Sequence, residues 1–216
     1  MRPEHIPQGV IERLPAYLSV LLQLRREGHD TASSARLGEL SEVNPAQIRR
    51  DLTHCGQFGK RGVGYDILTL IERLQGILGS DHIQRLVLVG AGHLGTAIAD
   101  YDGLRARGFV IACLFDNDPA KIGSRVADLI VRDVGEMERT VREQSIRAGV
   151  IAVPAGAAQE VADRMIDAGI RVILNYSSAM VRVPAHVTLH NTDPVRELLH
   201  TLYYLSRAED MAGVGV

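Results

Sequence analysis

One stretch decides the fold of this chain: LVLVGAGHLG, residues 86–95. Its four leading apolar residues predict a buried strand, and its glycines follow the pattern G-x-G-x-x-G at the start of a helix. Gly90 permits the tight turn, Gly92 lets the backbone approach a pyrophosphate, and Gly95 lets the helix pack on the strand. The free N–H groups of the helix N-terminus face the anion. The stretch therefore predicts a dinucleotide-binding loop.

An acidic residue stands where such a loop requires one. Asp116 ends a second apolar run, residues 108–115, about 20 residues after the last glycine. A carboxylate there accepts hydrogen bonds from a ribose diol and repels a 2′-phosphate, which favours NAD(H) over NADP(H). Lys121 lies in the turn that follows and is expected to close the adenosine side.

Apolar strands and helices alternate through the second part of the chain. The predicted strands are residues 86–89, 109–115, 149–153, 172–174 and 187–190, and the predicted helices lie near residues 94–107, 135–143 and 157–168. This alternation predicts an α/β domain with a doubly wound parallel sheet. We place its start after Gly79-Ser80-Asp81.

The preceding part follows helical spacing and predicts a helix-turn-helix. Ser33-Ser34 can cap a short helix, and Asn44-Pro45 supplies an N-cap and an N1 proline for the next helix. In that second helix, Ile48, Leu52 and Cys55 are expected in the core. The polar residues of its opposite face and flank are Gln47, Arg49, Arg50, Thr53 and His54. Guanidinium and amide groups on such a face suit the major groove of DNA.

A glycine-rich hairpin, residues 56–65, follows this helix and carries Lys60 and Arg61 near its tip. A wing of this kind can place cations along the adjacent minor groove. The pattern alone is equally compatible with a solvated charged helix and an ordinary turn.

Composition sets further limits. The formal net charge is −2, and no polybasic segment predicts nucleic-acid binding from charge alone. Two cysteines, Cys55 and Cys113, exclude a disulfide framework and fit a reducing compartment. No export signal or membrane-spanning stretch is recognisable, so we expect a soluble, cytoplasmic protein.

Several motifs occur together in one order. They are Arg49-Arg50-Asp51-Leu52, Gly59-Lys60-Arg61-Gly62-Val63-Gly64-Tyr65, the loop at residues 90–95 with Ala99-Asp100-Tyr101, Val153-Pro154-Ala155, Ile173-Leu174-Asn175 and Asp193. Over residues 6–207 the chain resembles the Rex family of redox-sensing transcriptional repressors. The combination of R-G-V-G-Y with this dinucleotide fold is specific, and it strengthens the prediction of DNA binding.

The resemblance implies three parts. Residues 1–79 would form a winged-helix DNA-binding domain, residues 80–191 a Rossmann NAD(H)-binding domain, and residues 192–208 a dimerisation helix exchanged between the subunits of a homodimer. Such a repressor binds an A/T-rich inverted-repeat operator in double-stranded DNA when NADH is scarce, and it leaves when NADH rises.

The resemblance also assigns residues. Three residues, Arg13, Tyr101 and Asp193, match the family's switch network. In that network, Tyr101 closes near the nicotinamide and Asp193 changes partner between Arg13 and Tyr101. The expected cofactor-binding residues are Gly90, Gly92, His93, Leu94, Gly95, Asp116, Lys121, Val153, Pro154 and Asn175. The expected DNA-binding residues are Gln47, Arg49, Arg50, His54, Lys60 and Arg61. No metal ligand and no catalytic residue is expected.

Departures from the family leave a divergent repressor with a weakened redox response as an alternative. His54-Cys55 stand where two aromatic residues are usual, Tyr176-Ser177-Ser178 replace the usual segment near the nicotinamide, and Thr192 replaces an aliphatic residue.

An NAD-dependent oxidoreductase is the rival class. Lysine occurs only at positions 60 and 121, so the chain has no Tyr-x-x-x-Lys pair and no evident general base. His186 and His190 lack the context of a zinc site. Thiol sensing is disfavoured because the register of Cys55 marks it as a core residue.

Overall fold

The structure is a computed structural model that describes residues 6–56, 59–60 as backbone alone, 64–193, and positions 195, 198, 199 and 202. The chain divides into two compact units between Ile83 and Gln84. The boundary predicted at Gly79-Ser80-Asp81 lies a few residues earlier, at the end of a helix whose cap, Gly79, has a left-handed backbone.

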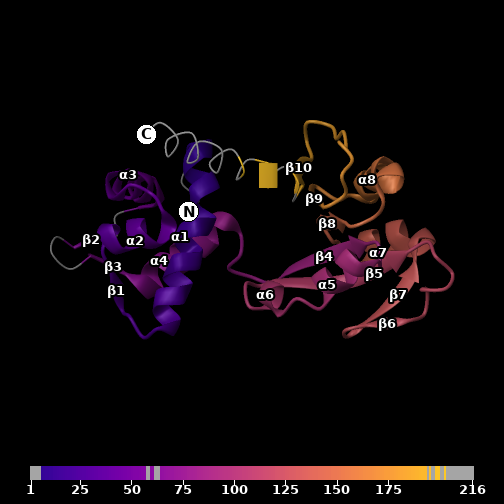
Figure 1. Cartoon of the computed structure of the whole chain (residues 1–216), viewed down its shortest axis with the longest axis horizontal. Helices are drawn as coiled ribbons and strands as arrows, with labels where there is room; N and C mark the ends of the chain where they lie inside the picture. Colours follow the sequence, from indigo (N-terminus) through magenta and orange to yellow (C-terminus); the bar gives the residue numbers. More distant parts are fainter. Residues whose placement is uncertain are drawn as a thin grey trace, which may run out of the picture. The chain divides into compact units, whose positions relative to one another are not determined.

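The second unit carries the α/β pattern that the alternation predicts (Figure 1). Its elements are β4 (Gln84–Val89), α5 (His93–Ala99), α6 (Asp102–Arg105), β5 (Phe109–Asp116), β6 (Arg125–Val126), β7 (Leu129–Asp133), the 3-10 turn η1 (Val134–Glu136), α7 (Met137–Glu143), β8 (Ala148–Ile151), α8 (Ala155–Ala168), β9 (Val172–Asn175) and β10 (Thr188–Asn191).

These strands form one seven-stranded sheet in the order β10-β9-β8-β4-β5-β7-β6. All neighbouring strands are parallel except β6 and β7. The chain runs from β4 outward to β5 and β7, then returns to β8 on the other side of β4. The direction of winding therefore reverses beside β4, and ligands of open α/β sheets bind at this point.

Both faces of the sheet are covered, which explains its continuous apolar strands. Val87 and Val89 point into a core shared with α7 and α8, including Met165. Leu88 points to the opposite face, where Ile98 of α5 packs. The doubly wound parallel sheet predicted from the sequence is confirmed, with one antiparallel edge strand that was not predicted.

Two local features differ from the prediction. The single helix expected near residues 94–107 is two helices, α5 and α6, separated at Asp100-Tyr101. The hairpin of β6 and β7 was not predicted, because β6 has only two residues and leaves no periodic pattern.

The first unit is helical with a small sheet. Its elements are α1 (Gln8–Arg26), β1 (Thr31–Ala32), α2 (Ser34–Ser41), α3 (Pro45–Cys55), β2 (Gly59–Lys60), β3 (Gly64–Asp66) and α4 (Ile67–Leu78). The strands pair antiparallel in the order β1-β3-β2. Residues Leu14, Tyr17, Ile48, Leu52 and Leu70 are buried in one apolar core.

The predicted helix caps of α2 and α3 form. Ser33 accepts a hydrogen bond from the N–H of Arg36, and Asn44 accepts one from the N–H of Ala46. Gly38 lets the turn between α2 and α3 lie against α2, since a Cβ on residue 38 would come within 2.6 Å of the Val43 carbonyl oxygen. The sequence thus folds into α2-turn-α3 followed by a β2–β3 hairpin, the order of a winged helix.

Candidate functional site

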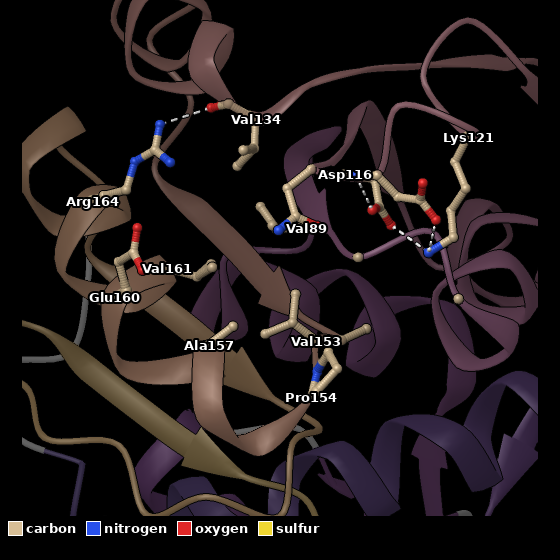
Figure 2. Close-up of a pocket in the computed structure, with 15 residues that line it drawn as sticks. Val89, Asp116, Lys121, Val134, Val153, Pro154, Ala157, Glu160, Val161 and Arg164 are labelled. Carbon is tan, nitrogen blue, oxygen red and sulfur yellow. Dashed lines mark hydrogen bonds and ion pairs between the residues drawn. The ribbon is translucent and has the colours of Figure 1, made fainter.

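A cavity of about 370 Å³ opens at the carboxyl ends of β4, β5 and β8, where the winding reverses. Its size lies within the range typical of small-molecule sites. In Figure 2, Asp116 and Lys121 lie together on one side of this cavity, Glu160 and Arg164 lie on the other, and Val89 and Val153 lie between them. The cavity therefore has an apolar middle and two charged ends.

The carboxylate of Asp116 is held in place by donors from the surrounding loops. It accepts hydrogen bonds from the N–H groups of Ala91, at 2.7 Å, and Asp118, at 2.9 Å. Lys121 Nζ lies 3.2 Å from its Oδ2. Burial alone would raise the pKa of Asp116, but these donors hold the pKa below its usual range. The group is therefore an oriented anion at the cavity wall.

The glycine loop owes its shape to missing side chains. Gly90 has φ +105°, and a Cβ there would overlap the carbonyl oxygen of Ala152. A Cβ on Gly95 would overlap the carbonyl oxygen of Gly90. At Gly92, by contrast, a Cβ would meet no atom within 4 Å. Gly90 and Gly95 therefore let the loop pack closely, whereas Gly92 leaves its backbone open to the cavity.

The far end of the cavity was not anticipated. Glu160 and Arg164 occur four residues apart on α8, so they share a helix face. The Arg164 guanidinium pairs with Glu138, with Nε 2.5 Å from Oε1, and donates to the Val134 carbonyl oxygen at 2.9 Å. The i, i+4 spacing of two charged residues on a helix after β8 is the signal that could have identified them.

Six of the ten expected cofactor-binding residues line the cavity: Gly90, Gly92, Asp116, Lys121, Val153 and Pro154. The other four do not. His93 and Leu94 are exposed on the first turn of α5, and Gly95 is buried under the loop. Asn175 is fully buried, so direct contact with a ligand in this cavity would require a rearrangement.

The amide of Asn175 is fully used within the protein. Its nitrogen donates to the Ala179 carbonyl oxygen and to Asn191 Oδ1, and its oxygen accepts from the N–H and hydroxyl of Ser177. A neutral amide offers two donors and two acceptor positions. Asn175 therefore organises the loop after β9.

The three expected switch residues have these positions. Arg13 on α1 pairs with Asp51 of α3, through Nε at 2.7 Å and Nη2 at 2.8 Å. Tyr101 lies between α5 and α6 with 59% of its surface exposed. Asp193 accepts a hydrogen bond from the N–H of Val195, as an N-cap does. The partner of Arg13 in its own unit was not predicted.

The polar face of α3 forms as expected, with one difference. Arg49, Arg50 and His54 are exposed. Gln47 was expected to face outward, but it is half-buried, and its amide nitrogen donates to Asp51 Oδ1 at 2.7 Å. Lys60 belongs to β2, and its side chain and Arg61 lie outside the described residues.

The described residues contain no group of three or more His, Cys, Asp and Glu side chains arranged to hold a metal ion. Within the same residues, no helix is long and apolar enough to cross a membrane.

Burial raises the pKa of the Cys55 thiol to about 11, which disfavours the reactive thiolate.

Two protein families match parts of the chain. Residues 81–179 match the CoA binding domain, and residues 5–53 match the family described as putative DNA-binding protein N-terminus. The match over residues 5–53 lies within the first unit, and the match over residues 81–179 begins three residues before the second unit and otherwise lies within it.

Similar proteins cover nearly the whole chain. The redox-sensing transcriptional repressor Rex of Rubrobacter xylanophilus is 50% identical over 201 residues, which is 93% of each chain. The protein of the same name from Chloroflexus aggregans is 46% identical over 208 residues, covering 96% of this chain and 98% of the relative.

Among solved structures, RSP in complex with beta-NAD+ and operator DNA has a TM-score of 0.87 and 34% identity, covering 97% of both chains. RSP in complex with beta-NADH has the same TM-score and 33% identity, covering 97% of this chain and 98% of RSP.

Proposed function

This chain belongs to the Rex family of redox-sensing transcriptional repressors, and on that premise we propose that it binds operator DNA through its first unit and leaves it when NADH occupies the second. The expected operator is an A/T-rich inverted repeat in double-stranded DNA. DNA binding is assigned to residues 1–79 and NAD(H) binding to residues 80–191. The working compartment is the cytoplasm.

One observation carries the proposal: a cavity with an oriented carboxylate, Asp116, belongs to the same chain as a helix-turn-helix with exposed arginines. Asp116 would bind the adenosine ribose, and the open backbone at Gly92 would admit the pyrophosphate. RSP, similar over its full length, binds both beta-NAD+ and operator DNA in one structure.

The redox state is read by binding. Oxidised nicotinamide carries a positive charge, whereas the reduced ring is neutral, so a site can distinguish them by its surroundings. A ligand shifts a protein between two forms only by its different affinity for each. NADH would favour an arrangement in which the two recognition helices no longer match the half-sites of the operator.

A homodimer supplies the two recognition helices. Four helical positions after β10 are apolar and exposed by 46–64%: Val195, Leu198, Leu199 and Leu202. Their spacing places them on one stripe, which a second copy of the chain would cover. We assign dimerisation to residues 192–208.

The nucleotide acts as a signal and is not turned over. Among the described residues, the cavity wall offers no His, Tyr or Cys as a proton donor or acceptor, and its lysine, Lys121, is ion-paired with Asp116 and Asp118. A dehydrogenase needs such a proton donor or acceptor beside the nicotinamide. Purified protein incubated with NADH and small carbonyl compounds is therefore expected to leave the NADH absorbance constant.

Fluorescence anisotropy tests the proposal. A labelled A/T-rich inverted repeat is bound by the protein and titrated separately with NADH and NAD+. Release by NADH at concentrations where NAD+ is ineffective supports the proposal. Equal release by both nucleotides, or no DNA binding, contradicts it.

Tyr101→Phe provides a sharper form of the same assay. The hydroxyl of Tyr101 is expected to take part in the closed NADH form, and the residue is exposed, so its loss leaves the fold intact. We expect NADH to bind the variant but to release the DNA at several-fold higher concentration. Release at the wild-type concentration would remove Tyr101 from the switch.

A further inference from the structure

A buried carboxylate links α1 to the polar face of α3. Asp51 is only 1% exposed, although a charged side chain in an apolar core is costly unless it is fully paired. It lies on α3 between the exposed arginines and the core residue Leu52. The role of this carboxylate is not explained by packing.

Four hydrogen bonds saturate Asp51. Arg13 donates to both carboxylate oxygens, Tyr17 Oη donates to Oδ2 at 2.6 Å, and Gln47 Nε2 donates to Oδ1 at 2.7 Å. A carboxylate has about four acceptor positions, so none is left. Burial would raise the pKa of Asp51, but these donors hold it below its usual range. The group is a fixed anion.

The donors come from two helices. Arg13 and Tyr17 occur four residues apart on α1 and present one face to α3. Gln47 lies one turn before Asp51 on α3 itself. The position of α1 therefore fixes the position of the Asp51 carboxylate. The carboxylate in turn fixes the orientation of the Gln47 side-chain amide.

The chain of contacts ends at an exposed cation. Gln47 Oε1 accepts a hydrogen bond from Arg50 Nη2 at 2.7 Å. Because the amide nitrogen of Gln47 is committed to Asp51, its oxygen points toward Arg50. The exposed guanidinium is thus connected to α1 through two intermediate side chains.

We infer that Asp51 is a positioning residue, through which Arg13 and Tyr17 of α1 hold Gln47 and Arg50 in the pose that reads operator DNA. The inference rests on the proposed function, because it needs α3 to contact DNA. Asp51 itself is too deeply buried to contact DNA directly. Any displacement of α1 would reach the reading side chains through this carboxylate.

The consequence is specific to sequence recognition. Nonspecific binding depends on phosphate charge, whereas specificity depends on the placement of side chains at base edges. Loss of the Asp51 contacts should therefore weaken operator binding more than binding to random DNA. A merely structural role would weaken both in parallel through the loss of folded protein.

The test uses full-length variants in anisotropy assays on operator and random duplexes at one salt concentration. Asp51→Asn is expected to reduce operator affinity about tenfold, the scale of one misread base pair, and random-DNA affinity by less than threefold. Asp30→Asn is the matched control, because Asp30 also pairs with an α1 arginine, Arg25, but is 84% exposed. It should change neither affinity.

A double-mutant cycle separates positioning from other effects. If Asp51 acts through Gln47, then Gln47→Leu should cost operator affinity in the wild type but little more in the Asp51→Asn background. Additive losses, a parallel loss on both duplexes, or an unchanged Asp51→Asn variant would overturn the inference. NADH affinity, measured on each variant, should remain at the wild-type value.

Measurements on the wild-type protein show whether the proposed function fails or only the role of Asp51. If it binds operator and random DNA equally, then the proposed function fails, and the inference fails with it. If it discriminates between them while the cycle is additive, then only the role of Asp51 is overturned.

Discussion

The sharpest prediction concerns the carboxylate at the end of β5. Asp116→Asn keeps the size of the side chain, removes its charge and replaces one acceptor oxygen with an NH2 donor. That donor would face the N–H of Ala91 or of Asp118, both of which point at the native carboxylate. The variant therefore loses part of its hold on the loop as well as an anion for the ribose.

The magnitude follows from the acceptor positions. Oδ2 accepts from Ala91 and Lys121, and Oδ1 accepts from Asp118, so about one of four positions is free. A second becomes available if Lys121, whose side chain is 39% exposed, swings away. Losing one hydrogen bond to a charged acceptor costs about 2 kcal/mol. This corresponds to about a 30-fold weaker NADH affinity.

NADPH should respond in the opposite direction. Two like unit charges about 4 Å apart near a protein surface repel each other by about 4 kcal/mol, so the Asp116 anion strongly disfavours a 2′-phosphate. In Asp116→Asn that repulsion is gone and the Lys121 cation remains beside the site. We expect the preference for NADH over NADPH to shrink far more than either affinity changes alone.

Isothermal titration calorimetry with NADH and NADPH measures both affinities. Glu160→Gln is the matched control, because it neutralises a carboxylate at the other end of the same cavity. A variant Asp116→Asn that binds NADH within about twofold of the wild type, with an unchanged NADPH affinity, would refute the assignment of Asp116 to the ribose.

Three more predictions follow from the same structure. Gly95→Ala should weaken NADH binding at least about tenfold by calorimetry, because its methyl group would overlap loop backbone, whereas Gly156→Ala, which has open space, should not. Arg50→Ala should lower operator affinity in gel shifts more than random-DNA affinity, whereas Arg61→Ala should lower both and reduce the salt dependence by about one unit, with NADH affinity unchanged in each variant. Because the folded-state pKa of Asp51 is lowered, its contribution is present above the ordinary carboxyl pKa of about 3.9 and is lost as pH falls through the folded value. The stability gap between wild type and Asp51→Asn, about 1–3 kcal/mol at neutral pH by urea unfolding, should therefore close in acid; a gap that persists would contradict the ion pair.

Regular elements of the second unit could be predicted because their signals are local. Apolar runs such as residues 86–89 and 109–115 fall within β4 and β5, and the glycine pattern marks the turn between strand and helix. The hairpin of β6 and β7 was not predicted, because a strand of two residues is too short to show an alternating pattern of apolar and polar residues. The break between helices α5 and α6 at Asp100-Tyr101 was not predicted, because neither residue is a strong helix breaker.

The candidate site residues could be predicted only where a local sequence signal marks them. Asp116 could be predicted because the motif fixes its spacing, and Lys121 because it lies in the turn that follows; both line the cavity. Asp51 was noted only as part of a motif, and its burial depends on Arg13, 38 residues earlier in the chain. No local pattern reveals such a partner. One clue was available: the helical register of Ile48, Leu52 and Cys55 places position 51 near the core side, where a charged residue implies a distant partner.

Asn175 shows a second limit of the sequence. A polar residue at the end of a strand beside a nucleotide fold is a natural ligand contact, and the sequence cannot tell whether its amide is already satisfied. In the structure, local contacts with Ser177 and Ala179 and a more distant contact with Asn191 use all its donors and acceptors. Its contact with the cofactor stays a prediction, whereas its bonds to the loop after β9 are seen in the structure.

This internally bonded amide separates the frame of the loop from its outward-facing positions. Ser177 belongs to the frame, since its backbone and hydroxyl both bond to Asn175, whereas Ser178 and Met180 are exposed. Substitutions at the two outer positions can therefore accumulate without reshaping the loop. A lineage could alter the exposed surface of this loop there while inheriting the same scaffold unchanged.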